Sequence, residues 1–221
     1  MSTDRESAPR GRHAPPLEVR QDRQRQRLFA AAAAVFARCG FAEATAEGIA
    51  REAGMSKATF YEHFDNKEDC ICALFDAATD ALLTAIRTAG ESVDAPRDPR
   101  ERYRASITAL LDVVAAFPDA AQTLLVEIIG AGPRAIERRD RVLGEFASYI
   151  DGRNAIDAAE GLVPRLGSPH DAFAIVGAVV ELASRQIRTS EPATMGELEP
   201  IVDRMIVGML AAADEAHPAS R

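Results

Sequence analysis

Long hydrophobic runs and a paired set of cysteines are both missing from this 221-residue sequence. No uninterrupted apolar run approaches the roughly 20 residues that a membrane-spanning helix needs, and the polar N-terminus lacks the hydrophobic segment of a signal peptide. The three cysteines, Cys39, Cys70 and Cys72, are an odd number, and the side chains of the last two diverge on a helix, which excludes a disulfide framework. We therefore expect a cytoplasmic protein that does not act at a membrane.

Motifs of catalysis and metal binding are missing as well. The four histidines are dispersed along the chain, and Cys70-x-Cys72 does not have the spacing of a zinc site. The sequence contains no glycine-rich phosphate loop and no nucleophile elbow. We expect no enzymatic activity, no cofactor and no metal, and the alternative is a pocket enzyme that uses Glu127 or His170.

Runs of β-branched residues are scarce and alanine is abundant, which favours helices. Apolar residues recur at helical spacing in segments bounded mostly by proline or glycine. These segments are 21–40, 45–54, 57–63, 67–88, 100–117, 119–130, 134–158, 169–188 and 195–213. The expected fold is all-α, with about nine helices. Its expected divisions are a flexible tail over 1–20, a three-helix domain over 21–66, a larger helical bundle over 67–215 and a second tail over 216–221.

The formal net charge of −8 argues at first against nucleic acid as a partner. The charge is unevenly distributed, however, because residues 1–41 hold eight arginines against four acidic side chains, and residues 1–70 hold equal numbers of both signs. The rest of the chain carries the whole negative balance. A basic-to-neutral front joined to an acidic rear keeps the N-terminal domain open to a negatively charged partner.

The segment GMSKATFYEHFDNKED, residues 54–69, gathers three aromatic residues in a chain with 5% aromatics. Two short helices joined by Ala-Gly-Met match the helix-turn-helix plan, in which the second helix lies in the major groove with its first residues against base edges. Gly54 permits the tight turn, because a positive φ costs glycine little. Phe60 and Phe64 are expected in the core. The alternative is a short aromatic helix that only packs.

The expected DNA contacts divide by role. Residues at the start of the recognition helix would face base edges, its polar tips would reach phosphates, and the first residues of the flanking helices sit where free backbone N–H groups favour a phosphate. The residues expected at base edges are Lys57, Ala58 and Thr59. Those expected to reach phosphates with their side chains are Tyr61 and His63. Those at the starts of the flanking helices are Thr45 and Lys67.

Residues about 24–70 resemble the N-terminal domain of the TetR family of bacterial transcriptional repressors, through LFAAAAAVFARCGFAEATAEGIAREAGMSKATFYEHFDNKED. The resemblance implies a DNA-binding domain over 21–66, a larger helical regulatory domain, and a homodimer that reads a palindromic operator. By position it places DNA contacts on Thr45, Ser56, Lys57, Ala58, Thr59, Tyr61, His63 and Lys67. Glu62 departs from the family, because many members have a neutral or basic residue there, and a carboxylate facing DNA would repel phosphate.

Arginines near the N-terminus are a weaker signal. Arg-Gly-Arg at 10–12, with Arg20, Arg23, Arg25 and Arg27, could reach an adjacent minor groove. The alternative, which the polar composition favours, is a solvated tail.

The last two helical segments carry an apolar stripe that is wider than one intramolecular contact needs. Two such helices from each subunit can form a four-helix bundle, as the resemblance also implies. The candidate dimer residues are Phe173, Val176, Val180, Ala183, Ile187, Leu198, Val202, Met205 and Met209. A dimer would place two recognition helices roughly 34 Å apart, one turn of DNA. The alternative is that both helices only close the core of one subunit.

Residues about 100–188 are expected to enclose an effector pocket, as in similar repressors, although a plain helical core has the same apolar composition. The candidate ligand residues are Leu110, Val114, Phe117, Thr123, Glu127, Phe146 and Phe173. The expected effector is apolar or aromatic rather than a sugar phosphate. It would act by population shift, with the helix from Lys67 as the lever. The alternative function is a helical adaptor or small-molecule-binding protein whose three-helix module binds protein.

Overall fold

The computed structural model describes residues 16–91 and 98–216 of the chain. These ranges form nine α-helices and two short 3-10 helices and contain no strand, which confirms the expected all-α fold. In chain order they are α1 (Leu17–Glu43), α2 (Ala46–Glu52), α3 (Lys57–His63), α4 (Lys67–Glu91), α5 (Pro99–Ala116), α6 (Pro118–Leu125), η1 (Glu127–Gly130), α7 (Pro133–Ala159), α8 (Pro169–Thr189), η2 (Met195–Leu198) and α9 (Glu199–Ala216).

Three elements differ clearly from their predicted extents, and one of them, predicted as a single helix over 195–213, divides into η2 and α9. α1 begins at Leu17, inside the expected tail, because residues 17–27 are mostly Leu, Glu, Gln and Arg, which are strong helix formers. The segment predicted as one helix over 119–130 divides into α6 and η1. The backbone leaves helical geometry at Val126, with φ −117° and ψ −60°, next to a Leu125 carbonyl that accepts a hydrogen bond from Ser184 of α8.

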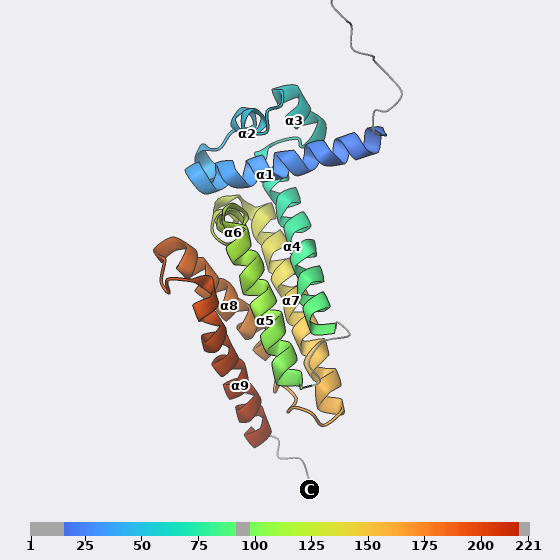
Figure 1. Cartoon of the computed structure of the whole chain (residues 1–221), viewed down its shortest axis with the longest axis vertical. Helices are drawn as coiled ribbons and strands as arrows, with labels where there is room; N and C mark the ends of the chain where they lie inside the picture. Colours follow the sequence, from blue (N-terminus) through green and yellow to red (C-terminus); the bar gives the residue numbers. More distant parts are fainter. Residues whose placement is uncertain (1–15, 92–97, 217–221) are drawn as a thin grey trace, which may run out of the picture.

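Figure 1 shows α1 lying across one end of the bundle that α4 to α9 form, with α2 and α3 on the far side of α1. α4 starts beside α1 and runs down the bundle next to α5 and α7. Within the described residues no single helix is long and apolar enough to cross a membrane, although α5 and α6 meet that test as a pair bent by 105°.

One hydrophobic cluster joins the N-terminal helices to the bundle. Leu28 and Phe36 of α1, Ile49 of α2 and Phe60 of α3 are fully shielded from solvent. The same cluster continues through α4 to Ile128 of η1 and into α7. The three-helix module is therefore packed against the bundle, and a shift of the bundle helices bears directly on its position.

Candidate DNA-binding surface and effector cavity

The turn between α2 and α3 is built by two helix caps and a glycine. The side-chain oxygens of Thr45 and Ser56 each accept the backbone N–H three residues later, both at 3.0 Å, as the sequence predicts for N-caps. Gly54 has a φ of 65°, in the left-handed region that favours glycine. Arg27 of α1 donates to the carbonyl of Ala53 at 2.6 Å and ties this turn to the first helix.

α3 divides its side chains between the core and one outer face. Phe60 is fully buried and Phe64 is 4% exposed, with their rings 5.4 Å apart. Lys57, Ala58 and Tyr61 are exposed on the other side of the helix. The buried aromatic rings thus fix the helix in an orientation that presents its first turn and Tyr61 to a partner.

Lys67 does not direct its ammonium outward. Its Nζ donates to the backbone carbonyls of Phe41 and Ala42, both at 2.8 Å, and of Ala44 at 3.0 Å. It also lies 4.6 Å from the centroid of the Phe41 ring. Carbonyls at the C-terminal end of a helix have no partner inside that helix, and Lys67 supplies one. The Lys67 side chain thus ties α4 to the end of α1, and the phosphate contact expected at the first backbone N–H groups of α4 stays a prediction.

His63 is also less available than expected. Its Nε2 is buried and has no hydrogen-bond partner within the described ranges, and its ring centroid lies 6.2 Å from that of Phe64. That nitrogen does not reach the outer face, and the phosphate contact expected of this half-buried residue stays a prediction. Glu62 is exposed, so the repulsion that its carboxylate would exert on phosphate is a feature of this surface.

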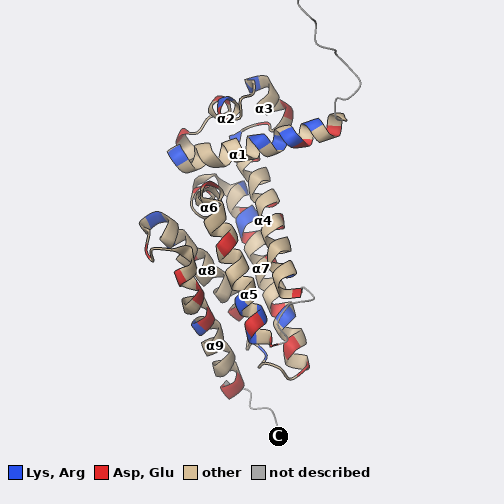
Figure 2. Cartoon of the chain, in the orientation of Figure 1, with Lys and Arg blue, Asp and Glu red and all other residues tan. Residues whose placement is uncertain are grey.

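The arginines at the start of α1 fall into two groups. Figure 2 shows basic residues spaced along α1. Arg25 stacks over the rings of Phe29 and Phe64 at 5.2 and 5.3 Å, and Arg27 holds the α2–α3 turn. Of the predicted minor-groove contacts in the described helix, Arg20, Arg23 and Arg27 are exposed, and Arg27 is already bonded to the turn. The segment 10–12 lies outside the described residues.

The local geometry of this module agrees with a known family. Residues 28–74, which contain α2 and α3 with both caps, match the family model described as bacterial regulatory proteins, tetR family. The chain belongs to the TetR family. Its helix-turn-helix is the DNA-binding element of a transcriptional regulator, and the family is non-enzymatic, in agreement with the sequence.

Of two curated relatives, one is an activator and the other is a repressor. The HTH-type transcriptional activator FasR of Mycolicibacterium smegmatis is 31% identical over 49% of this chain and 48% of its own. The HTH-type transcriptional repressor SCO4008 of Streptomyces coelicolor is 30% identical over 58% of this chain and 63% of its own. The match with FasR thus spans about half the length of that relative.

Solved structures share the whole fold. The fatty acid degradation regulator FadR from Bacillus halodurans has a TM-score of 0.77 at 20% identity, covering 90% of this chain and 98% of its own. FadR from Bacillus subtilis, solved in complex with stearoyl-CoA, has a TM-score of 0.71 at 18% identity, covering 82% and 97%. At these identities the likeness shows the common architecture of this TetR-family chain.

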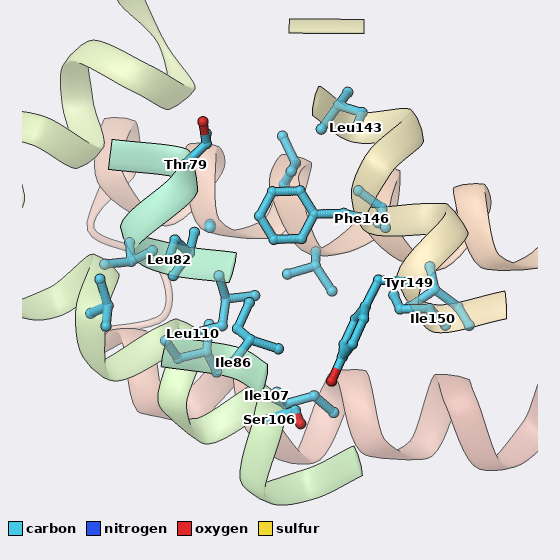
Figure 3. A pocket seen from close by; sticks show the side chains of 18 of the residues that line it. Thr79, Leu82, Ile86, Ser106, Ile107, Leu110, Leu143, Phe146, Tyr149 and Ile150 are labelled. Atoms are coloured by element: carbon cyan, nitrogen blue, oxygen red, sulfur yellow. The ribbon is translucent and has the colours of Figure 1, made fainter. Parts of the chain in front are cut away.

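A cavity of about 520 Å³ lies inside the bundle and receives wall residues from α4, α5, α6, α7, α8 and α9. This volume falls in the range of small-molecule sites. Figure 3 shows part of its lining, which is predominantly aliphatic and aromatic. The labelled apolar residues are Leu82 and Ile86 of α4, Ile107 and Leu110 of α5, and Leu143, Phe146 and Ile150 of α7.

The predicted ligand residues separate into two sets. Those that line the cavity are Leu110, Val114, Phe117 and Phe146. Thr123 is fully buried against α1, where it donates to the carbonyl of Ala33 at 3.2 Å. Glu127 accepts the backbone N–H of Phe41 at 3.0 Å. Phe173 is 45% exposed. None of these three belongs to the cavity wall, so their predicted ligand role is corrected.

Sequence reasoning missed the wall that α4 provides through Leu82 and Ile86, and on α7 it predicted Phe146 but not Tyr149. A core stripe and a cavity wall share the same apolar periodicity, so three-dimensional placement alone separates them.

A buried ion cluster lies where α5 begins and α7 ends. The Asp157 carboxylate is fully buried and accepts hydrogen bonds from Arg102 at 2.5 Å, Tyr103 at 2.8 Å and Arg153 at 2.9 Å. Burial and the adjacent Asp157 raise the pKa of Tyr103 above its usual range, so this phenol stays a donor. Paired in this way, the carboxylate is a structural element of the bundle.

The predicted dimer stripe lies largely inside the protomer. Four of its residues are buried there: Val176, Ala183, Leu198 and Val202. Four others are half-buried: Val180, Ile187, Met205 and Met209. The structure therefore corrects the extent of the predicted dimer surface, because part of the stripe packs in the core and lines the cavity of one protomer. Phe173 remains 45% exposed on α8, and Ile201, which backed the stripe on α9, is 36% exposed.

Proposed function

We propose that the protein is a dimeric repressor that leaves a palindromic operator when an effector with a long apolar chain fills its cavity. The observation that carries this proposal is that α4 and α6 border both the cavity and the DNA-binding module. Both helices supply wall residues to the cavity, and both contact α1 of the DNA-binding module. A change of cavity content thus bears on elements that position the recognition helix.

The DNA-facing residues follow from the exposure of α3. Lys57 and Ala58, in its first turn, would meet base edges, and Tyr61 would donate to a phosphate. Thr45 and Ser56 cap the N-termini of α2 and α3, and the Thr59 hydroxyl lies 2.9 Å from that of Ser56. The N-terminus of α4 adds a further phosphate site through its backbone.

Lys57 is free to change partners. Its Nζ lies 3.9 Å from a carboxylate oxygen of Glu47, with the two side chains 58% and 71% exposed. An exposed pair of this kind is weak, so a phosphate or a guanine edge can replace the carboxylate at little cost.

The outer faces of α8 and α9 are the proposed dimer surface. Phe173 and Ile201 supply exposed apolar side chains. A Cβ added at Gly177 of α8 or Gly208 of α9 would meet nothing within 4 Å, so both glycines face open space in the protomer. Two such helices can approach a second pair closely around a two-fold axis.

The shape of the cavity favours a chain over a compact ring. Its wall residues in α4 run from Phe75 to Gly90, a distance of about 22 Å at about 1.5 Å per helical residue. Wall residues that follow most of α4 favour an elongated ligand. FadR from Bacillus subtilis was solved with stearoyl-CoA, and we extend this class of acyl effector to the present chain.

Release of the operator follows from a difference in affinity. The effector must bind one arrangement of α4 and α6 better than the other. Thr123 and Glu127, which hydrogen-bond α1, would carry the shift from α6, and α4 would carry it as the lever expected from the sequence. The second candidate is an activator, which the similarity to the activator FasR favours.

Selection of the purified protein against a random duplex library, at physiological salt and with or without stearoyl-CoA, tests this function. A palindromic consensus with half-sites one turn apart, lost when stearoyl-CoA is added, supports the repressor. Enrichment that stearoyl-CoA strengthens supports an activator or corepressor mode. Absence of any enrichment, together with binding that does not fall steeply with salt, supports the protein-binding adaptor instead.

A further inference from the structure

The two ends of the cavity differ in polarity. Near α1 the wall consists of Phe75, Phe117 and the α6 residues Ala121 and Leu124, all apolar. Arg139 is a polar wall residue at this end, and its guanidinium lies 3.6 Å from the exposed carboxylate of its neighbour in sequence. Its charge is thus paired with a carboxylate outside the cavity wall.

Two hydroxyl groups converge at the opposite end. Figure 3 shows Tyr149 reaching from α7 toward Ser106 on α5. A Cβ added at Gly90 of α4 would lie 3.1 Å from the Ser106 oxygen and 3.7 Å from the Tyr149 oxygen, so the glycine leaves room for both. The structure gives neither hydroxyl a hydrogen-bond partner among the residues it describes. An apolar wall that carries two such donors favours a ligand with a matching acceptor.

Most of the neighbouring polar side chains are already engaged. Tyr103 donates to Asp157, and Asn154 donates to the carbonyl of Pro164. Arg153 donates to Asp157 through one nitrogen, while its buried Nε has no hydrogen-bond partner among the described residues. Thr79, farther along α4, donates to carbonyls of its own helix at 2.7 and 3.0 Å. Ser106 and Tyr149 are thus the wall hydroxyls with capacity for a ligand.

We infer that Ser106 and Tyr149 bind the carbonyl oxygen of an acyl effector whose chain runs along the cavity toward α6. The inference rests on the proposed effector class and adds its orientation. Burial and the carboxylate of Glu91 raise the pKa of Tyr149, so the phenol is a hydrogen-bond donor at neutral pH. With the carbonyl fixed at this end, chain length decides whether the terminal methyl group reaches α6.

A matched pair of ligands tests the carbonyl site in the full chain by isothermal titration calorimetry. Palmitoyl-CoA and S-hexadecyl-CoA share the same head and chain length, but the thioether lacks the carbonyl oxygen. We expect the wild type to bind palmitoyl-CoA about three- to tenfold more tightly, the effect of one or two neutral hydrogen bonds. Tyr149→Phe and Ser106→Ala should each reduce this preference and leave S-hexadecyl-CoA binding unchanged. Ser148→Ala, which removes an exposed hydroxyl bonded to its own helix, is the control that keeps the preference.

The carbonyl site would be overturned if the wild type bound the two ligands with equal affinity. It would also be overturned if Tyr149→Phe lowered the affinity for both ligands by the same factor. Binding of neither ligand would overturn the acyl effector class and, with it, the proposed function. Thermal melts identify a variant that does not fold, in which case the other hydroxyl variant decides.

Direction is tested by chain length. Octanoyl-CoA should occupy the carbonyl site but release operator at least tenfold less effectively than palmitoyl-CoA at equal occupancy, because its chain stops short of α6. Val114→Phe, which narrows the cavity one turn before Phe117, should weaken palmitoyl-CoA more than octanoyl-CoA. A chain directed toward α6 is contradicted if the two ligands release operator equally well. It is also contradicted if Val114→Phe weakens the binding of both ligands equally.

Discussion

Tyr61 and Phe60 are neighbours on α3 with opposite environments. The Phe60 ring is buried and meets the ring of Tyr61 edge-on, with centroids 5.5 Å apart, while 49% of Tyr61 is exposed. Tyr61→Phe keeps this contact and removes the hydroxyl. We expect about three- to tenfold weaker binding to operator and to unrelated duplex alike, since a phosphate contact carries no sequence information. Fluorescence anisotropy on both duplexes measures this, and a loss confined to operator would argue for a base contact.

Glu62 and Lys57 allow opposite tests on the same helix. Glu62→Gln removes a negative charge from the exposed face and should strengthen binding to every duplex, with a steeper dependence on salt. Lys57→Ala should change the consensus that a random library yields, because a side chain in the first turn reads base edges. A consensus identical to that of the wild type would remove Lys57 from the readout.

Local chemistry made part of this site predictable. Thr45, Ser56 and Gly54 have roles that depend on backbone geometry a few residues away, and short sequence patterns encode such geometry. Lys67 and His63 were assigned to DNA because each lies at the correct position in the motif. Their partners, the carbonyls at the end of α1 and the core beside Phe64, come from packing between elements, which no local pattern records.

At the scale of elements, α6 has two working faces. One face borders the cavity through Ala121 and Leu124, and the other bonds α1 through Thr123. Glu127 continues this second face in η1. Both faces are apolar in sequence with a few polar residues. The sequence therefore predicted the helix, but it assigned Thr123 and Glu127 to the cavity instead of to the face that contacts α1.

Glu127→Ala tests the connection between α6 and the DNA-binding module. The variant leaves the Phe41 N–H without its acceptor, which should lower the free energy of unfolding by about 1–3 kcal/mol. It should also raise the concentration of stearoyl-CoA that releases operator, while the affinity for the ligand itself stays close to that of the wild type. Calorimetric melts and release titrations measure both effects. Glu145→Ala, on the exposed surface of α7, is the control; equal release curves for the two variants would remove this route of coupling.

At the scale of the whole molecule, α8 and α9 line the cavity and also carry the proposed dimer surface. Phe173→Glu places a charge on the proposed dimer surface. We expect a monomer by light scattering and at least a hundredfold loss of operator affinity, because the two half-sites are then bound independently. Ile156→Glu changes a side chain of similar exposure, 51% against 45%, on α7 and should stay dimeric. A Phe173→Glu dimer would place the interface elsewhere.

Lys57 and Lys67 are the two lysines of the chain, and their surroundings make them chemically unequal. Three carbonyls surround the amine of Lys67, whereas Lys57 is 58% exposed. A brief pulse of an amine-acetylating reagent should therefore mark Lys57 far faster than Lys67, and a peptide map separates it from the α-amine. Operator bound over α3 would slow this labelling, and an effector that empties the operator would restore it. One lysine would thus report both events in a mixture with no fluorophore attached.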